Sequence, residues 1–102
     1  MSRFFFDDER AVAYKINPLV TSVLYSSSKE PQAILVQTNV KVTNFKKEKV
    51  RRILSEVYPI DKYDAEKAKE KFNETLIQNL VGNAKKITEA EYESIKAKVE
   101  NI

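Results

Sequence analysis

The sequence predicts a single α+β domain in which a β-sheet precedes a group of helices. The length of 102 residues suits one compact domain. The first half is rich in strand-type alternation, and the second half shows the apolar spacing of helices. Apolar residues make up 42% of the chain, enough for a hydrophobic core. We therefore expect an antiparallel sheet of three or four strands, followed by about three helices packed on one face of it.

The first half contains four segments with the composition of strands. Residues 4–6 and 11–16 flank a polar stretch and predict a hairpin. Residues 19–25 follow the chain-breaking Asn17-Pro18 pair and are rich in β-branched and aromatic side chains. The clearest strand covers residues 32–42. Its alternate positions are β-branched and predict one buried face, formed by Ile34, Val36, Thr38, Val40 and Val42.

A first helix is expected over residues 44–58, ending before Pro59. Thr43 or Asn44 can cap its first turn. Four apolar residues then recur at the helical spacing i, i+3, i+4 and i+7, namely Val50, Ile53, Leu54 and Val57.

A second helix is expected after a cap at Asp61 or Asp64. One side of it carries Ala65, Ala68, Phe72, Leu76 and Leu80. Gly82 follows where a residue with positive φ is wanted. Residues 75–81 fit either the end of this helix or a strand.

The last helix has the clearest local signature in the chain. Thr88 and Glu91 have the spacing of a capping box, and Ile87 and Tyr92 that of a hydrophobic staple. A narrow apolar stripe then runs along the helix through Tyr92, Ile95, Val99 and Ile102. Because so narrow a stripe is typical of a helix that packs against another chain, we expect these residues to contact a partner.

The segment 82–99 resembles the short C-terminal domains of the oligomerisation type. The matching residues are Gly82, Ile87, Thr88, Glu91, Tyr92, Lys96, Lys98 and Val99. The chain departs from that pattern through the additional residues 83–86. The resemblance implies self-association, and our functional interpretation does not depend on it.

The composition argues against catalysis. The chain has no His, no Cys and a single Gly, Gly82. It therefore lacks the usual acid–base residue near neutral pH, the usual zinc ligands and any glycine-rich phosphate loop. Acidic residues are expected to serve as helix caps and surface charge. We expect no enzyme activity, no cofactor and no metal site.

Two groups of residues are candidates for binding. Basic residues gather within 44–58, at Lys46, Lys47, Lys49, Arg51 and Arg52. Such a cluster on one helix suits the phosphates of a nucleic acid, although it also suits an ordinary solvated face. The second group is Phe4, Phe5 and Phe6, which alternation along a strand cannot bury on one side of a sheet. We expect at least one of these rings to contact a partner.

We interpret the protein as a non-catalytic interaction or assembly module, of the kind that viruses, phages and mobile elements encode. The alternative is a nucleic-acid-binding accessory protein that uses the helix 44–58. We expect a protein partner or a homo-oligomer. Because residues 1–8 lack the long apolar run of a signal peptide, and no other segment could span a bilayer, we expect no membrane association. The expected location is the cytoplasm, or the virion if the protein is viral.

Overall fold

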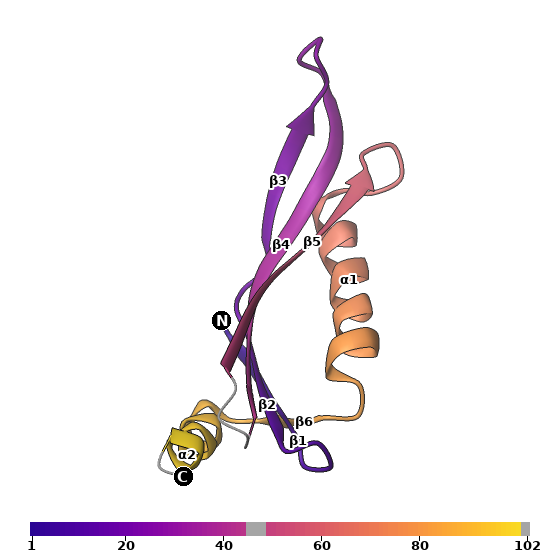
Figure 1. Cartoon of the computed structure of the whole chain (residues 1–102). Coiled ribbons are helices and arrows are strands. Elements are labelled where there is room, and N and C mark those ends of the chain that lie inside the picture. The colour runs from indigo at the N-terminus through magenta and orange to yellow at the C-terminus, as the bar shows by residue number, and fades with distance from the viewer. Residues whose placement is uncertain (45–48, 101–102) are drawn as a thin grey trace.

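In the computed structural model, the chain forms an elongated body of 55 × 22 × 20 Å built around one sheet (Figure 1). The structure describes residues 1–44 and 49–100, with the backbone alone for 49, 99 and 100. The strands in these ranges are β1 (Arg3–Asp7), β2 (Val12–Ile16), β3 (Val20–Tyr25), β4 (Pro31–Asn44), β5 (Lys49–Pro59) and β6 (Lys85–Ile87). The helices are α1 (Ala65–Leu76), which continues into the π-helical turn η1 (Ile77–Val81), and α2 (Glu89–Glu100). The α+β class is confirmed, with more strands and fewer helices than expected.

The long strand β4 is the centre of the sheet, and all pairing in the described chain is antiparallel. One edge of β4 pairs with β5 over eleven consecutive positions. The other edge is shared by β3 and β2, which follow one another along it. At the break between β2 and β3, Asn17 is still hydrogen-bonded to β4, since its backbone N–H donates to the Asn39 carbonyl at 3.0 Å. Beyond β2 the sheet continues with β1 and then β6.

The expected helix over residues 44–58 is wrong. Asn44 ends β4, residues 45–48 lie outside the described residues, and the segment from Lys49 to Pro59 is the strand β5. The four apolar residues with helical spacing divide between the two faces of this strand, two on each. Residues with strong β-propensity, including Val50, Ile53, Val57 and Tyr58, pair with β4, and this pairing outweighs the local helical pattern.

α1 covers one face of the sheet. Asp64 caps it by accepting a hydrogen bond from the Lys67 backbone N–H at 2.8 Å. Its buried side chains join the alternate residues of β4 in one core cluster that includes Ile34, Val36, Val40, Ala68, Phe72 and Leu76. The predicted buried face of residues 32–42 is thus confirmed, as Val36 and Val40 have no exposed surface.

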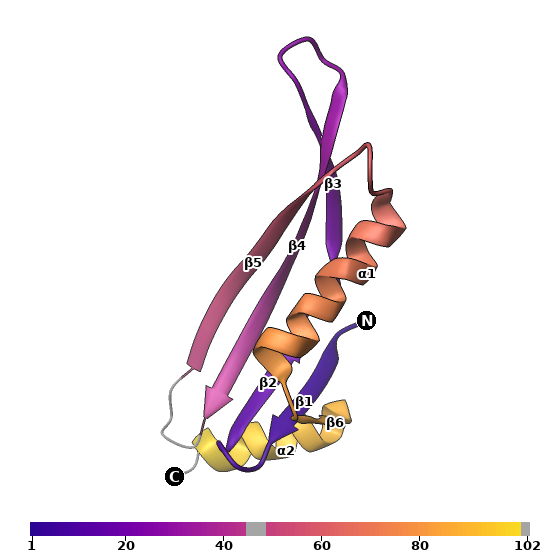
Figure 2. The ribbon, with the colours of Figure 1, turned by 90° about the vertical axis from the view of Figure 1, so that its right-hand side faces the viewer.

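α2 lies on the opposite face, so the expectation that all helices cover one face is wrong (Figures 1 and 2). The predicted capping box is present, with Glu91 N–H donating to Thr88 Oγ1 and Thr88 N–H donating to Glu91 Oε1, each at 3.1 Å. Tyr92 packs on Phe4, with ring centroids 5.1 Å apart. The physical reason is alternation in β1, which directs Phe5 to the α1 side and Phe4 to the α2 side.

The ambiguous segment 75–81 is helical. It completes α1 and continues as η1, and Gly82 then closes it by donating its N–H to the Ile77 carbonyl at 2.7 Å. Gly82 has φ of +57°, as its place after a helix predicts. No helix in the described part of the chain is both long and apolar enough to cross a membrane.

Candidate interaction surface

The sheet face opposite α1 is largely uncovered, and we call it the open face. Among the described elements, α2 covers its end at β1, β2 and the adjoining part of β4 (Figure 1). The rest of it exposes apolar side chains from β3, β4 and β5, which are Val20, Leu24, Leu35, Ile53 and Val57. Ile53 is 72% exposed and Val57 is 50% exposed. A group of exposed apolar side chains on one flat surface is typical of a protein contact site.

The outer edge of β5 is a second exposed feature. Among the described strands, β5 pairs with β4 alone, and Figure 2 shows no element beside its outer edge. Ile60 N–H donates to the Gln32 carbonyl at 3.1 Å, and hydrogen-bonded pairs alternate along an antiparallel ladder. Even-numbered amides of β5 therefore bond to β4. The amides of Arg51, Ile53, Ser55 and Val57 point outward, and such a row can pair with another strand.

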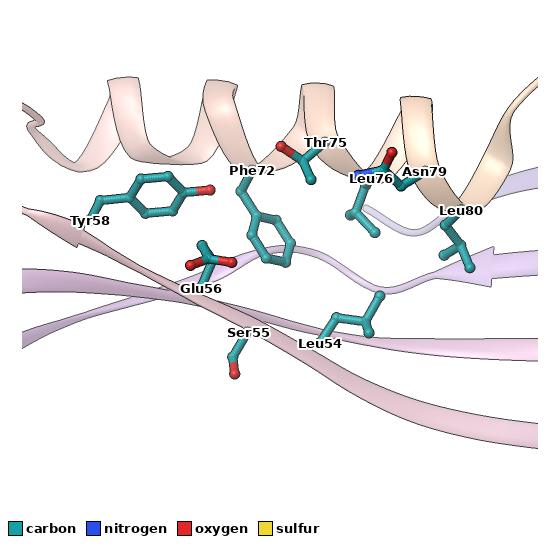
Figure 3. A pocket seen from close by; sticks show the side chains of 9 residues that line it. All are labelled: Leu54, Ser55, Glu56, Tyr58, Phe72, Thr75, Leu76, Asn79 and Leu80. Carbon is teal, nitrogen blue, oxygen red and sulfur yellow. The ribbon is translucent and has the colours of Figure 1, made fainter.

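A hollow of about 290 Å³ lies between β5 and α1, on the face opposite the open face (Figure 3). Leu54 and Glu56 point from β5 toward the helix in this view, while Ser55 points away. The helix contributes apolar side chains, including Phe72, Leu76 and, beyond them, Leu80 of η1. Burial, with a smaller contribution from Glu56, raises the pKa of Tyr58, so its hydroxyl stays neutral at ordinary pH. Glu56 supplies the carboxyl group among the residues that line this hollow.

Three basic residues form a row across the open face. Lys15 of β2 lies opposite Lys41 of β4, which lies opposite Arg51 of β5. Side chains at such directly opposed positions have Cβ atoms about 5 Å apart. They line a shallow hollow of about 490 Å³ together with Asn17 and Asn39, and no carboxylate is among its described lining residues.

The strand register explains why this face is basic. Every charged residue at a described open-face position of the paired strands is Lys or Arg, whereas Asp7 of β1 and Glu56 of β5 point to the α1 side. Like charges at directly opposed positions destabilise a strand pair, and a nearby anion offsets their repulsion. The arrangement can therefore hold an oxyanion by charge and hydrogen-bond donation.

The residues expected to contact a partner occupy different environments. Phe4, Phe5 and Tyr92 are buried within the chain, and Phe6 and Ile95 are partly buried against Phe4 and Tyr92. The side chain of Val99, and Ile102 as a whole, lie outside the described residues.

The residues expected to bind nucleic acid are also divided. Arg51 and Arg52 are adjacent and exposed in β5, and alternation places them on opposite faces of the sheet. Lys46, Lys47 and the side chain of Lys49 lie outside the described residues.

Sequence reasoning missed Lys15 and Lys41 as neighbours of Arg51. Both lie at polar positions of predicted strands, and this pattern indicates that their side chains face solvent. Their alignment with Arg51 depends on the register between three strands, which the sequence pattern does not give. It also missed Ile53 and Val57 as exposed side chains, because the helical pattern assigned them to a core.

The described residues contain no cluster of three or more Asp or Glu placed to hold a metal ion. Comparison with known proteins gives no match to a protein family, to a curated protein or to a solved structure. The geometry of the open face and of the β5 edge therefore carries the functional argument alone.

Proposed function

We propose that this chain is a non-catalytic assembly module that associates with protein chains, its own copies included, through the sheet. The observation that carries the proposal is β5, which combines an outer edge that pairs with no other described strand and exposed apolar side chains on the adjoining open face. Exposed apolar surface favours association because contact removes it from water. Backbone hydrogen bonds along a free strand edge fix the direction and the register of the strand that pairs with it.

Molar mass by light scattering, measured over a wide range of protein concentration, tests this function. We expect the mass to rise above the 11.8 kDa of one chain as the concentration increases. A mass that stays at 11.8 kDa at every concentration would count against assembly of this protein with itself.

A second candidate function, binding of nucleic acid, is favoured by the row of Lys15, Lys41 and Arg51. Within residues 1–44 and 49–100 no loop closes over the row, so it suits repeated contacts with a phosphate backbone better than capture of one small anion. Binding of this kind gains free energy from release of counterions and weakens steeply with salt. α2 projects from the same face, where it contacts β1, β2 and β4 (Figure 1). That projection hinders a flat bilayer more than a narrow nucleic-acid strand.

The same light-scattering experiment with added DNA duplex at low salt separates the two candidates. Assembly predicts an increase in mass without DNA. Nucleic-acid binding predicts an increase only when DNA is present and its loss as salt is raised.

A further inference from the structure

We infer that β5 pairs edge to edge with β5 of a second copy, antiparallel, about a two-fold axis at Leu54. The inference rests on the proposed assembly function and names its partner and its register. A two-fold contact is the commonest form of association between identical chains, and an antiparallel strand pair has that symmetry. The two sheets would then form one continuous sheet through the centre of the dimer.

The outward-pointing amides restrict the possible registers. Arg51, Ile53, Ser55 and Val57 direct their N–H and C=O groups to the free edge, so these residues must form the hydrogen-bonded pairs of the new ladder. This condition allows three symmetric registers near the middle of the strand, centred on Ile53, Leu54 or Ser55.

The charges of β5 distinguish these registers. With the axis at Leu54, Arg52 of each copy lies opposite Glu56 of the other, which gives two opposite-charge pairs. With the axis at Ile53, Arg52 lies opposite Leu54. With the axis at Ser55, Leu54 lies opposite Glu56, and Arg52 lies opposite Tyr58. Only the register at Leu54 gives an opposite charge to both Arg52 and Glu56, the two charged residues of β5 on the α1 side.

The geometry of the ladder strengthens this pairing. Arg52 and Glu56 use their own N–H groups toward β4, so in the new ladder they form non-hydrogen-bonded pairs. Side chains approach most closely in such pairs, with Cα atoms about 4.5 Å apart. Both side chains are exposed in the single chain and point to the α1 side, so neither must leave a partner inside the core.

The apolar residues agree with the same register. Leu54 of each copy meets its counterpart at the axis, beside the hollow that Leu54, Phe72 and Leu76 line in each chain. On the other side of the sheet, the two open faces become one continuous surface. The contact therefore covers a partly exposed leucine, and the apolar side chains of the open face stay accessible for contact with a further protein chain.

Charge reversal tests the inference. Arg52→Glu places two Glu–Glu pairs in the dimer, and Glu56→Arg places two Arg–Arg pairs. We expect each variant alone to raise the dimer dissociation constant about tenfold or more, since opposed like charges destabilise a ladder that opposite charges stabilise. An equimolar mixture of the two variants restores both attractive pairs, so we expect a heterodimer with nearly the unmodified affinity. The double variant R52E/E56R restores the homodimer in the same way.

Arg51→Glu is the matched control. It makes the same charge change on the neighbouring residue of the same strand, but in this register Arg51 lies opposite Val57, on the open face. Its dimer should therefore be unaffected by like-charge pairing, and it should not gain affinity for either single variant. Circular dichroism of every variant checks that the fold is retained, and analytical ultracentrifugation gives the dissociation constants.

The outcomes separate the register from the function. Weak dimerisation of each single variant, together with a tight heterodimer in their mixture, supports the Leu54 register. If the unmodified chain assembles but the single variants assemble equally well, the inference is wrong and the assembly function stands. If the unmodified chain remains a monomer at every concentration, both the inference and self-assembly are wrong.

Discussion

β4 and β5 are neighbouring strands that pair with each other over eleven positions, yet they meet different surroundings. β4 has partners on both edges, and its residues Ile34, Val36 and Val40 are at most 4% exposed. β5 has one partner among the described strands, and its Ile53 is 72% exposed. Both strands are rich in β-branched residues. Ile34, Val36 and Val40 of β4 therefore stabilise the fold by burial, whereas Ile53 and Val57 of β5 remain exposed on the single chain.

The largest expected effect compares an isoleucine in each strand. Ile34→Ala should lower the free energy of unfolding by roughly 2–5 kcal/mol, because it removes buried methylenes and leaves a cavity. Ile53→Ala should change it by no more than about 0.5 kcal/mol, because that side chain is already in contact with water. Denaturation by urea at a low protein concentration, where association is absent, measures both values. Equal losses from the two substitutions would remove the distinction between the strands.

A smaller effect is expected at α2, which covers the end of the open face. Thr88→Ala removes the acceptor for the Glu91 N–H and should cost about 1 kcal/mol. Hydrogen exchange of the first-turn amides of α2 should become faster, while exchange in β4 and β5 follows only the global loss. If neither stability nor exchange changes, the capping box does not hold this helix in place.

Arg51 and Arg52 give the finest comparison, since they are adjacent residues with the same charge on opposite faces. If the row of Lys15, Lys41 and Arg51 binds duplex DNA, the slope of log K against log salt should be no steeper than roughly −2.7 for three contacts. Arg51→Gln should then reduce the slope by about 0.9, and Arg52→Gln should leave it unchanged. Fluorescence anisotropy with a labelled duplex measures these slopes. No binding at low salt would exclude the second candidate function.

These comparisons also show how far local sequence could predict the molecule. The hairpin of β1 and β2, the buried face of β4, the Asp64 cap of α1 and the Thr88–Glu91 box follow from patterns within a few residues of one another, and all are present. β5 could not be predicted in this way. Its apolar spacing fits a helix. It is a strand because it pairs with β4, and the partners at one end of this ladder, Ala33 and Pro59, are far apart in the sequence.

The candidate surface was harder to predict than the fold for the same reason. The row of Lys15, Lys41 and Arg51 depends on two strand registers, and the open face depends on α1 and α2 taking opposite sides of the sheet. The sequence does contain the Arg52 and Glu56 charges. Their proposed role can be inferred only once residues 49–59 are known to form an edge strand, because the charge pairs that we infer join two copies of the chain.

The most direct test of the central claim is amide hydrogen exchange along β5, measured by NMR at low and high protein concentration. The even-numbered amides of Arg52, Leu54 and Glu56 bond to β4 and should be protected at both concentrations. The outward amides of Arg51, Ile53, Ser55 and Val57 should exchange quickly at low concentration and become protected at high concentration, as the edge pairs with a second copy. Outward amides that exchange equally fast at both concentrations, in a sample whose molar mass has doubled, would contradict edge pairing through β5.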